Sequence, residues 1–147
     1  MARTAIVPAY HWSARGIGDR RMALWGGFML RSIAGQVYFA GDTGYGNGAI
    51  FRAMRADYGP TDIALLPIGA YAPRWFMAAQ HTDPDDAVRI MLDLEARLAI
   101  GIHWGGFQLT DEAREEPVAL LRQALIEHGI EEARFPAATA GDVLEPL

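Results

Sequence analysis

Short apolar runs separated by glycine-bearing loops recur along the chain, and runs of this length are typical of β-strands. We predict strands at residues 4–8, 22–33, 36–40, 62–68 and 98–102. The second run is interrupted by Gly26 and Gly27, which indicate a bulge or a close backbone approach, and it pairs with the third run through a hairpin. A last short strand is expected at residues 142–144.

Three segments show the periodicity of amphipathic helices, at residues 49–58, 83–97 and 117–128. The second has the clearest start, because Asp83 can cap the helix, Pro84 suits its first position and two more acids lie in its first turn. Strands that alternate with helices, without a repeat or a linker, predict a single α/β domain over residues 1–147.

Composition and charge exclude several kinds of partner and site. The formal net charge is -5, so the chain lacks the clustered basic residues that bind nucleic acid. It has no cysteine, which excludes disulfides, thiolate metal ligands and cysteine nucleophiles. Because it also lacks a membrane-spanning apolar run and a signal-peptide pattern, we expect a cytoplasmic protein. Peripheral membrane contact is the alternative, since it needs only an apolar patch.

Three metal-capable side chains, His11, Asp42 and His103, each follow a predicted strand. The carboxyl ends of strands in open α/β sheets meet at one edge, so these side chains are expected to converge. Imidazole and carboxylate suit zinc, and also iron or manganese. The alternatives are a histidine packed beside its tryptophan neighbour, Trp12 or Trp104, and an aspartate that organises its own turn.

Six ordered motifs strengthen the metal interpretation. They are Tyr10-His11-Trp12-Ser13, Phe39-Ala40-Gly41-Asp42-Thr43-Gly44-Tyr45, Leu66-Pro67-Ile68-Gly69-Ala70-Tyr71, Pro73-Arg74-Trp75-Phe76-Met77, Gln80-His81-Thr82-Asp83-Pro84 and Ile102-His103-Trp104-Gly105. In order and spacing, over about residues 7–135, the chain resembles the metallo-β-lactamase-fold hydrolases similar to N-acylphosphatidylethanolamine-hydrolysing phospholipase D. The resemblance implies that this chain is the carboxy-terminal half of an αββα sandwich.

The resemblance also implies a site with two zinc ions. His11 would bind one metal, Asp42 would bridge both, and His103 would bind the other. His81 would lie close to the metals and assist the reaction; the alternative is that it only supports the helix start at Asp83. The family's remaining ligands come from a His-x-His-x-Asp-His motif, which this sequence lacks. Three side chains cannot hold two zinc ions, so we expect an incomplete site.

Two functions follow from these expectations. The first is a phosphodiesterase for a lipid-like substrate, in which zinc lowers the pKa of a bound water to about 7. Arg74 would bind phosphate, or pack its stem on a neighbouring aromatic ring. Tyr71, Trp75 and Phe76 would line an acyl-chain path. The alternative is that they form a core cluster under the loop that contains them. The second function is that of a catalytically silent fragment or binding module.

Incompleteness also predicts a partner. Losing half of a two-sheet sandwich would leave apolar sheet faces exposed, so we expect either a homo-oligomer or a separate amino-terminal half that covers them. Whether this chain is active by itself stays open at the level of the sequence.

Overall fold

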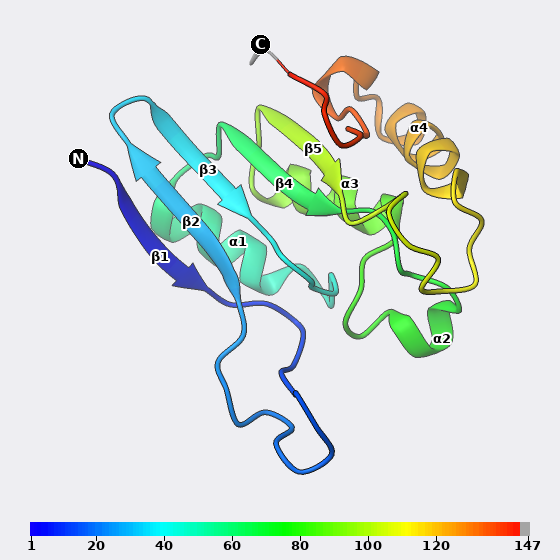
Figure 1. The fold of residues 1–147 in the computed structure, drawn as a ribbon. Helices are drawn as coiled ribbons and strands as arrows, with labels where there is room; N and C mark the ends of the chain where they lie inside the picture. Colours follow the sequence, from blue (N-terminus) through cyan, green and yellow to red (C-terminus); the bar gives the residue numbers. More distant parts are fainter. Residues whose placement is uncertain (145–147) are drawn as a thin grey trace.

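The computed structural model describes residues 1–144, which build a five-stranded sheet in the order β1-β2-β3-β4-β5 (Figure 1). The first three strands pair antiparallel, whereas β3, β4 and β5 run parallel. All strands except β2 therefore point their carboxyl ends to the same edge. The strands are β1 (Arg3–Val7), β2 (Gly27–Ser32), β3 (Gly35–Phe39), β4 (Ile63–Pro67) and β5 (Leu98–Ile102).

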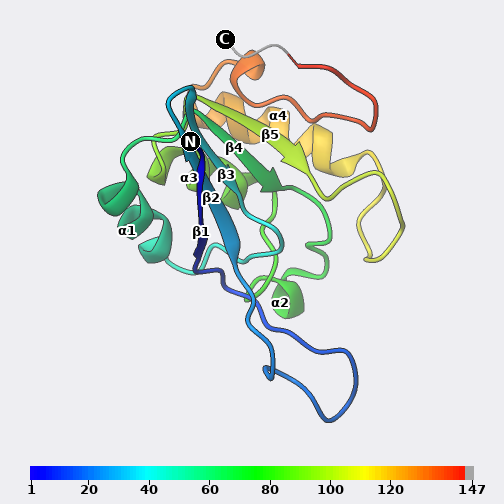
Figure 2. The same cartoon turned by 60° about the vertical axis from the view of Figure 1, so that its left-hand side comes forward.

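Helices cover one face of this sheet (Figure 2). The helices are α1 (Ala49–Tyr58), α2 (Arg74–Met77), α3 (Pro84–Asp93) and α4 (Glu116–His128), followed by the 3-10 turn η1 (Glu132–Arg134). Met29, Tyr38, Ala64 and Ala99 lie opposite one another across four strands and are buried under α1, α3 and α4. The apolar side chains of this single face form the core.

The strong sequence signals are confirmed. All five main strands form, and Asp83 caps α3, because its carboxylate accepts a hydrogen bond of 2.8 Å from the backbone amide of Asp86. Gly129 ends α4 in the left-handed conformation, with a φ of 67°. The predicted apolar face of α3 is buried, and it consists of Ala87, Ile90, Met91 and Leu94.

Several boundaries were predicted wrongly. Residues 22–26 belong to a long loop that extends away from the sheet (Figure 1), and β2 begins only at Gly27. Helix α3 ends at Asp93 rather than at residue 97, because Glu95 adopts a left-handed φ of 47°. Residues 142–144 form no strand, and residues 74–77, where no helix was predicted, form the short helix α2.

The opposite face of the sheet is apolar and largely uncovered by the described residues (Figures 1 and 2). Ile6, Phe28 and Phe39 are neighbours across β1, β2 and β3, and they are 64%, 41% and 38% exposed. The row continues through Leu65 and Ile100, where the segment after η1 borders it. One sheet with helices on one face corresponds to half of the expected four-layer sandwich.

No helix within residues 1–144 has both the length and the apolar character needed to cross a membrane.

We expect the chain to associate through its uncovered apolar face, because burial of these side chains is favourable. Replacing Phe28 and Phe39 with lysine should convert the assembly into single chains, measured by light scattering after size-exclusion chromatography. Ile126→Lys is the matched control, since Ile126 is 79% exposed on α4, and this variant should keep the wild-type mass. A wild-type mass equal to one chain would contradict the expectation.

Candidate metal centre

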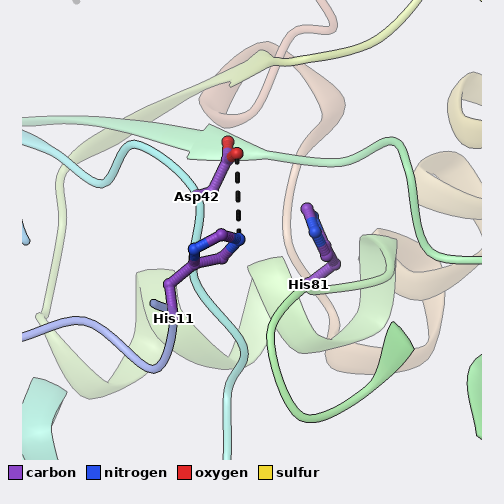
Figure 3. Close-up of side chains that lie close together, drawn as sticks. All are labelled: His11, Asp42 and His81. Atoms are coloured by element: carbon purple, nitrogen blue, oxygen red, sulfur yellow. Dashed lines mark ion pairs between the residues drawn. The ribbon is translucent and has the colours of Figure 1, made fainter. Parts of the chain in front are cut away.

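The metal-capable side chains predicted from the sequence meet at the carboxyl edge of the sheet. His11 follows β1, Asp42 follows β3 and His103 follows β5 directly. His81 comes from the segment between α2 and α3, and its side chain points toward His11 and Asp42 (Figure 3). The structure therefore brings four residues from distant parts of the sequence into one cluster.

The two carboxylate oxygens of Asp42 face different histidines. Nε2 of His103 lies 3.1 Å from Oδ1 of Asp42, and Nε2 of His11 lies 4.0 Å from Oδ2. This arrangement suits a carboxylate that bridges two sites, as the family resemblance implies. Asp42 is 39% exposed, so the cluster is open to solvent on one side.

The histidine rings are oriented by their surroundings. Nδ1 of His11 donates to the carbonyl oxygen of Trp12 at 2.8 Å, which leaves the lone pair of Nε2 directed at the cluster. The ring of His81 stands edge-on to that of His11, with 5.2 Å between the ring centroids, and lies 6.0 Å from that of His103. His81 thus faces the site rather than only supporting the start of α3.

The pKa of His81 is set mainly by its burial. Loss of solvent lowers the pKa of His81, and this effect outweighs the attraction of the Asp42 carboxylate, which acts in the opposite direction. Nδ1 of His81 is buried and has no hydrogen-bond partner among residues 1–144. This nitrogen is therefore free of any bond to the described residues.

Backbone pairing places His11 beside Asp42. The amide of Gly44 donates to the carbonyl of Tyr10 at 2.9 Å, and the amide of Tyr10 donates to the buried hydroxyl of Thr43 at 3.0 Å. Gly44 is needed for close packing, because a Cβ atom there would lie 2.8 Å from the carbonyl oxygen of Ala79. The Gly-Asp-Thr-Gly motif therefore connects the loops after β1 and β3 to the segment that carries His81.

Arg74 anchors the backbone of His81. Its Nη1 donates to the carbonyl oxygen of His81 at 2.8 Å, its Nε lies 3.1 Å from Asp83, and its Nη2 pairs with Asp86. Thr82 adds a second anchor, since its hydroxyl donates to the carbonyl of Pro67 at 2.7 Å. The guanidinium predicted to bind phosphate is thus already engaged by acceptors of the protein.

His103 lies in a strained part of the backbone. Its φ is 60°, an unusual value for a residue with a side chain. Gly69, in the loop that follows β4, allows the close approach of this backbone, because a Cβ atom there would lie 2.4 Å from the carbonyl oxygen of His103. The close approach brings the loops after β4 and β5 together and turns His103 toward Asp42.

Glu112, which was not among the predicted site residues, holds the loop after β4. Its buried carboxylate accepts hydrogen bonds from the amides of Ala70 and Ala72, at 2.7 and 3.0 Å, and from the hydroxyl of Thr110 at 2.7 Å. Burial alone would raise the pKa of Glu112, but the hydrogen bonds from Thr110, Ala72 and Ala70 outweigh it and lower the pKa. No local motif marks this residue, because its backbone partners Ala70 and Ala72 lie 42 and 40 positions away.

The aromatic residues predicted to contact substrate divide into two groups. Tyr71 is buried, and its hydroxyl donates to Glu116 at 2.8 Å. Trp75 and Phe76 are 87% and 63% exposed on α2, with their rings packed edge to face, so neither belongs to a core cluster. A cavity of about 250 Å³ opens beside His103, and its lining includes Trp104.

Gly69→Ala should destabilise the fold by about 1–3 kcal/mol, because the added methyl group meets backbone atoms that cannot rotate away. Displacement of His103 should also weaken zinc binding by about tenfold or more, the size of effect seen when groups that orient ligands are disturbed. Denaturant unfolding and calorimetric zinc titration measure the two effects. Gly106→Ala is the control, since a Cβ atom at Gly106 meets nothing within 4 Å. Equal values for both variants would contradict the role of Gly69.

Solved structures share this fold. The isothiocyanate hydrolase from Delia radicum gut bacteria superposes with a TM-score of 0.70 at 20% identity, covering 96% of this chain and 52% of that protein. The metallo hydrolase Igni18 from Ignicoccus hospitalis gives a TM-score of 0.65, also at 20% identity, over 96% of this chain and 51% of that one. Such similarity establishes the fold alone.

Sequence relatives are more specific. N-acyl-phosphatidylethanolamine-hydrolyzing phospholipase D 1 of Caenorhabditis elegans is 36% identical over 141 residues, which is 95% of this chain and 39% of the relative. The mitochondrial N-acyl-phosphatidylethanolamine-hydrolyzing phospholipase D of Saccharomyces cerevisiae is 40% identical over 111 residues, which is 75% of this chain and 24% of the relative. The chain thus spans well under half the length of these curated relatives.

A family model described as a β-lactamase superfamily domain matches residues 2–104. That range contains His11, Asp42, His81 and His103, and it includes all five strands. The chain therefore belongs to the β-lactamase superfamily, among the metal-dependent hydrolases of the metallo-β-lactamase fold.

Proposed function

We propose that this chain is the carboxy-terminal part of a zinc-dependent phosphodiesterase that hydrolyses N-acylphosphatidylethanolamine or a similar lipid. The observation that carries the proposal is the placement of His11 and His103 at opposite oxygens of Asp42. The similarity to two phospholipases named for this substrate supports the choice of reaction.

The donor set fits a divalent metal. His11, Asp42 and His103 would hold the ions, with Asp42 shared between them, and iron or manganese would accept the same nitrogen and oxygen ligands. Bound zinc supplies a water of lowered pKa and polarises the phosphoryl oxygen. The remaining ligands would come from the amino-terminal half of the sandwich or from another chain.

His81 would carry the proton in this reaction. Burial lowers the pKa of its imidazole, which lies beside Asp42 and His11, so a ring nitrogen would accept a proton from the attacking water and return it to the leaving oxygen. Arg74 and Thr82 would keep the ring in position by fixing the backbone on either side of it. A catalytic proton carrier must be held in this way, because small displacements slow proton transfer.

Exposed aromatic side chains support a lipid-like substrate. Trp75 and Phe76 on α2 would contact acyl chains or the membrane surface from which the substrate is drawn. Tyr71 is buried and donates to Glu116, so we assign the acyl contact to Trp75 and Phe76. Arg74 would reach a phosphate group only by breaking its ion pairs with Asp83 and Asp86. We therefore propose that Arg74 positions His81 and does not bind phosphate.

A catalytically silent binding module is the second candidate. The observation that favours it is the uncovered apolar face formed by Ile6, Phe28 and Phe39, which could bind a partner whether or not the metal site works.

Asp42→Asn should lower the rate of lipid hydrolysis by at least about 100-fold, because the variant loses the negative charge that the two metal positions share. The measurement is release of phosphatidic acid from N-acylphosphatidylethanolamine in mixed micelles, with zinc, iron or manganese added. Asp57→Asn on the exposed side of α1 is the matched control and should retain full activity. The assay uses the protein with its amino-terminal half present. No hydrolysis by that wild-type protein with any of the three metals bound would favour the silent module.

A further inference from the structure

We propose that Tyr45, Arg52 and Asp93 are positioning residues for the metal centre, because they hold the loop that carries Asp42. We call these three side chains the Tyr45 cluster. The inference rests on the metal-binding role of Asp42 in the proposed function, but it does not depend on the substrate.

Backbone amides do not hold the carboxylate of Asp42. Within residues 1–144 it pairs with His11 and His103 and accepts no hydrogen bond from a backbone amide. The carboxylate of Glu112, by contrast, accepts hydrogen bonds from two amides. The loop at residues 40–48 also contains three glycines with positive φ values, and glycine is the residue with the most conformational freedom. The position of Asp42 therefore depends on the contacts that hold this loop.

Tyr45 holds the loop close to Asp42. Its ring stacks on the buried ring of Phe51, with 6.1 Å between the ring centroids and an angle of 3° between the planes. Its hydroxyl donates to Oδ2 of Asp93, the last residue of α3, at 3.0 Å. Tyr45 lies three residues after Asp42, so these two contacts limit how far Asp42 can move.

Arg52 joins the cluster from α1. Its Nη1 donates to the same Oδ2 of Asp93 at 3.0 Å, and its Nη2 donates to the carbonyl oxygen of Asn47 at 2.8 Å. Gly48 lets these groups meet, because a Cβ atom there would lie 2.6 Å from the hydroxyl oxygen of Tyr45. One carboxylate thus connects the loop, directly and through Arg52, to α1 and α3.

Helix α3 links the Tyr45 cluster to the segment of His81. The helix ends at Asp93, and at its start Asp83 pairs with Arg74, which donates to the carbonyl oxygen of His81. A helix holds its ends at a fixed separation, because it rises by about 1.5 Å per residue. Helix α3 therefore sets where the loop of Asp42 lies relative to His81.

The alternative role of the cluster is to stabilise the packing of α1 against α3. The side chain of Arg52 is 53% exposed, however, and exposed ion pairs contribute little to folding stability. Loss of the Tyr45 hydroxyl also leaves the stacked ring in place. We therefore expect loss of the cluster to affect the loop more than the stability of the whole fold.

Tyr45→Phe tests the inference in the protein with its amino-terminal half present. Zinc affinity should fall by about tenfold or more, the size of effect seen when groups that orient metal ligands are disturbed, while the Tm of the metal-free protein changes little. In the metal-free protein the amide of Gly44 should exchange its hydrogen faster, measured by NMR, because the loop opens more often. Tyr58→Phe is the matched control, since the ring of Tyr58 faces Arg31 at the end of α1, and it should leave affinity and exchange unchanged.

Asp93→Ala gives a second variant, which removes the acceptor shared by Tyr45 and Arg52. It should also weaken zinc binding by about tenfold or more. The double variant Tyr45→Phe/Asp93→Ala should bind zinc no more weakly than Asp93→Ala, because the hydroxyl acts through Asp93. Additive losses of affinity would contradict a shared role.

The outcomes separate the inference from the proposed function. Unchanged zinc affinity and unchanged exchange at Gly44 in Tyr45→Phe would overturn the inference and leave the proposed hydrolysis standing. Faster exchange throughout the protein, with a lowered Tm, would indicate a structural role and would also overturn it. Weaker zinc binding with faster exchange confined to the loop, in a protein that hydrolyses no lipid, would support the inference and count against the proposed function.

Discussion

The carboxylate of Asp42 occupies the point where the loops after β1, β3 and β5 meet, and much of the structure is arranged around it. One of its oxygens faces His103 and the other faces His11. The side chains around a shared carboxylate in a partly open site must be held in fixed positions, because metal binding depends on ligand geometry within fractions of an ångström. The parallel direction of β1, β3, β4 and β5 provides that geometry, since it delivers each loop to the same edge of the sheet.

Buried hydrogen bonds hold these loops in place. Thr43 joins the loop after β3 to Tyr10, Arg74 holds the carbonyl of His81, and Glu112 binds the amides of Ala70 and Ala72. Each partner is buried or half-buried, so loss of one leaves another polar group unsatisfied, at a cost of about 1–3 kcal/mol. This supporting network explains how strained conformations persist at Ala70 and His103.

The two faces of the sheet serve different purposes. The face under α1, α3 and α4 forms the core. The other face carries Ile6, Phe28 and Phe39 toward solvent, which is the position that a second sheet would fill in a four-layer sandwich. In the function that we propose, an amino-terminal half would both complete the metal site and cover this face.

The sequence by itself determined the local structure and the identity of the metal-capable residues. Apolar runs predicted the five strands, and Asp83 and Pro84 predicted the start of α3, because these signals act over a few residues. The positions of His11, Asp42 and His103 after strands predicted that these side chains converge. The tertiary structure alone decided the roles of Gly69, Glu112 and Arg74. Their contacts join loops far apart in the chain, and such contacts exist only after the sheet has brought its carboxyl edge together.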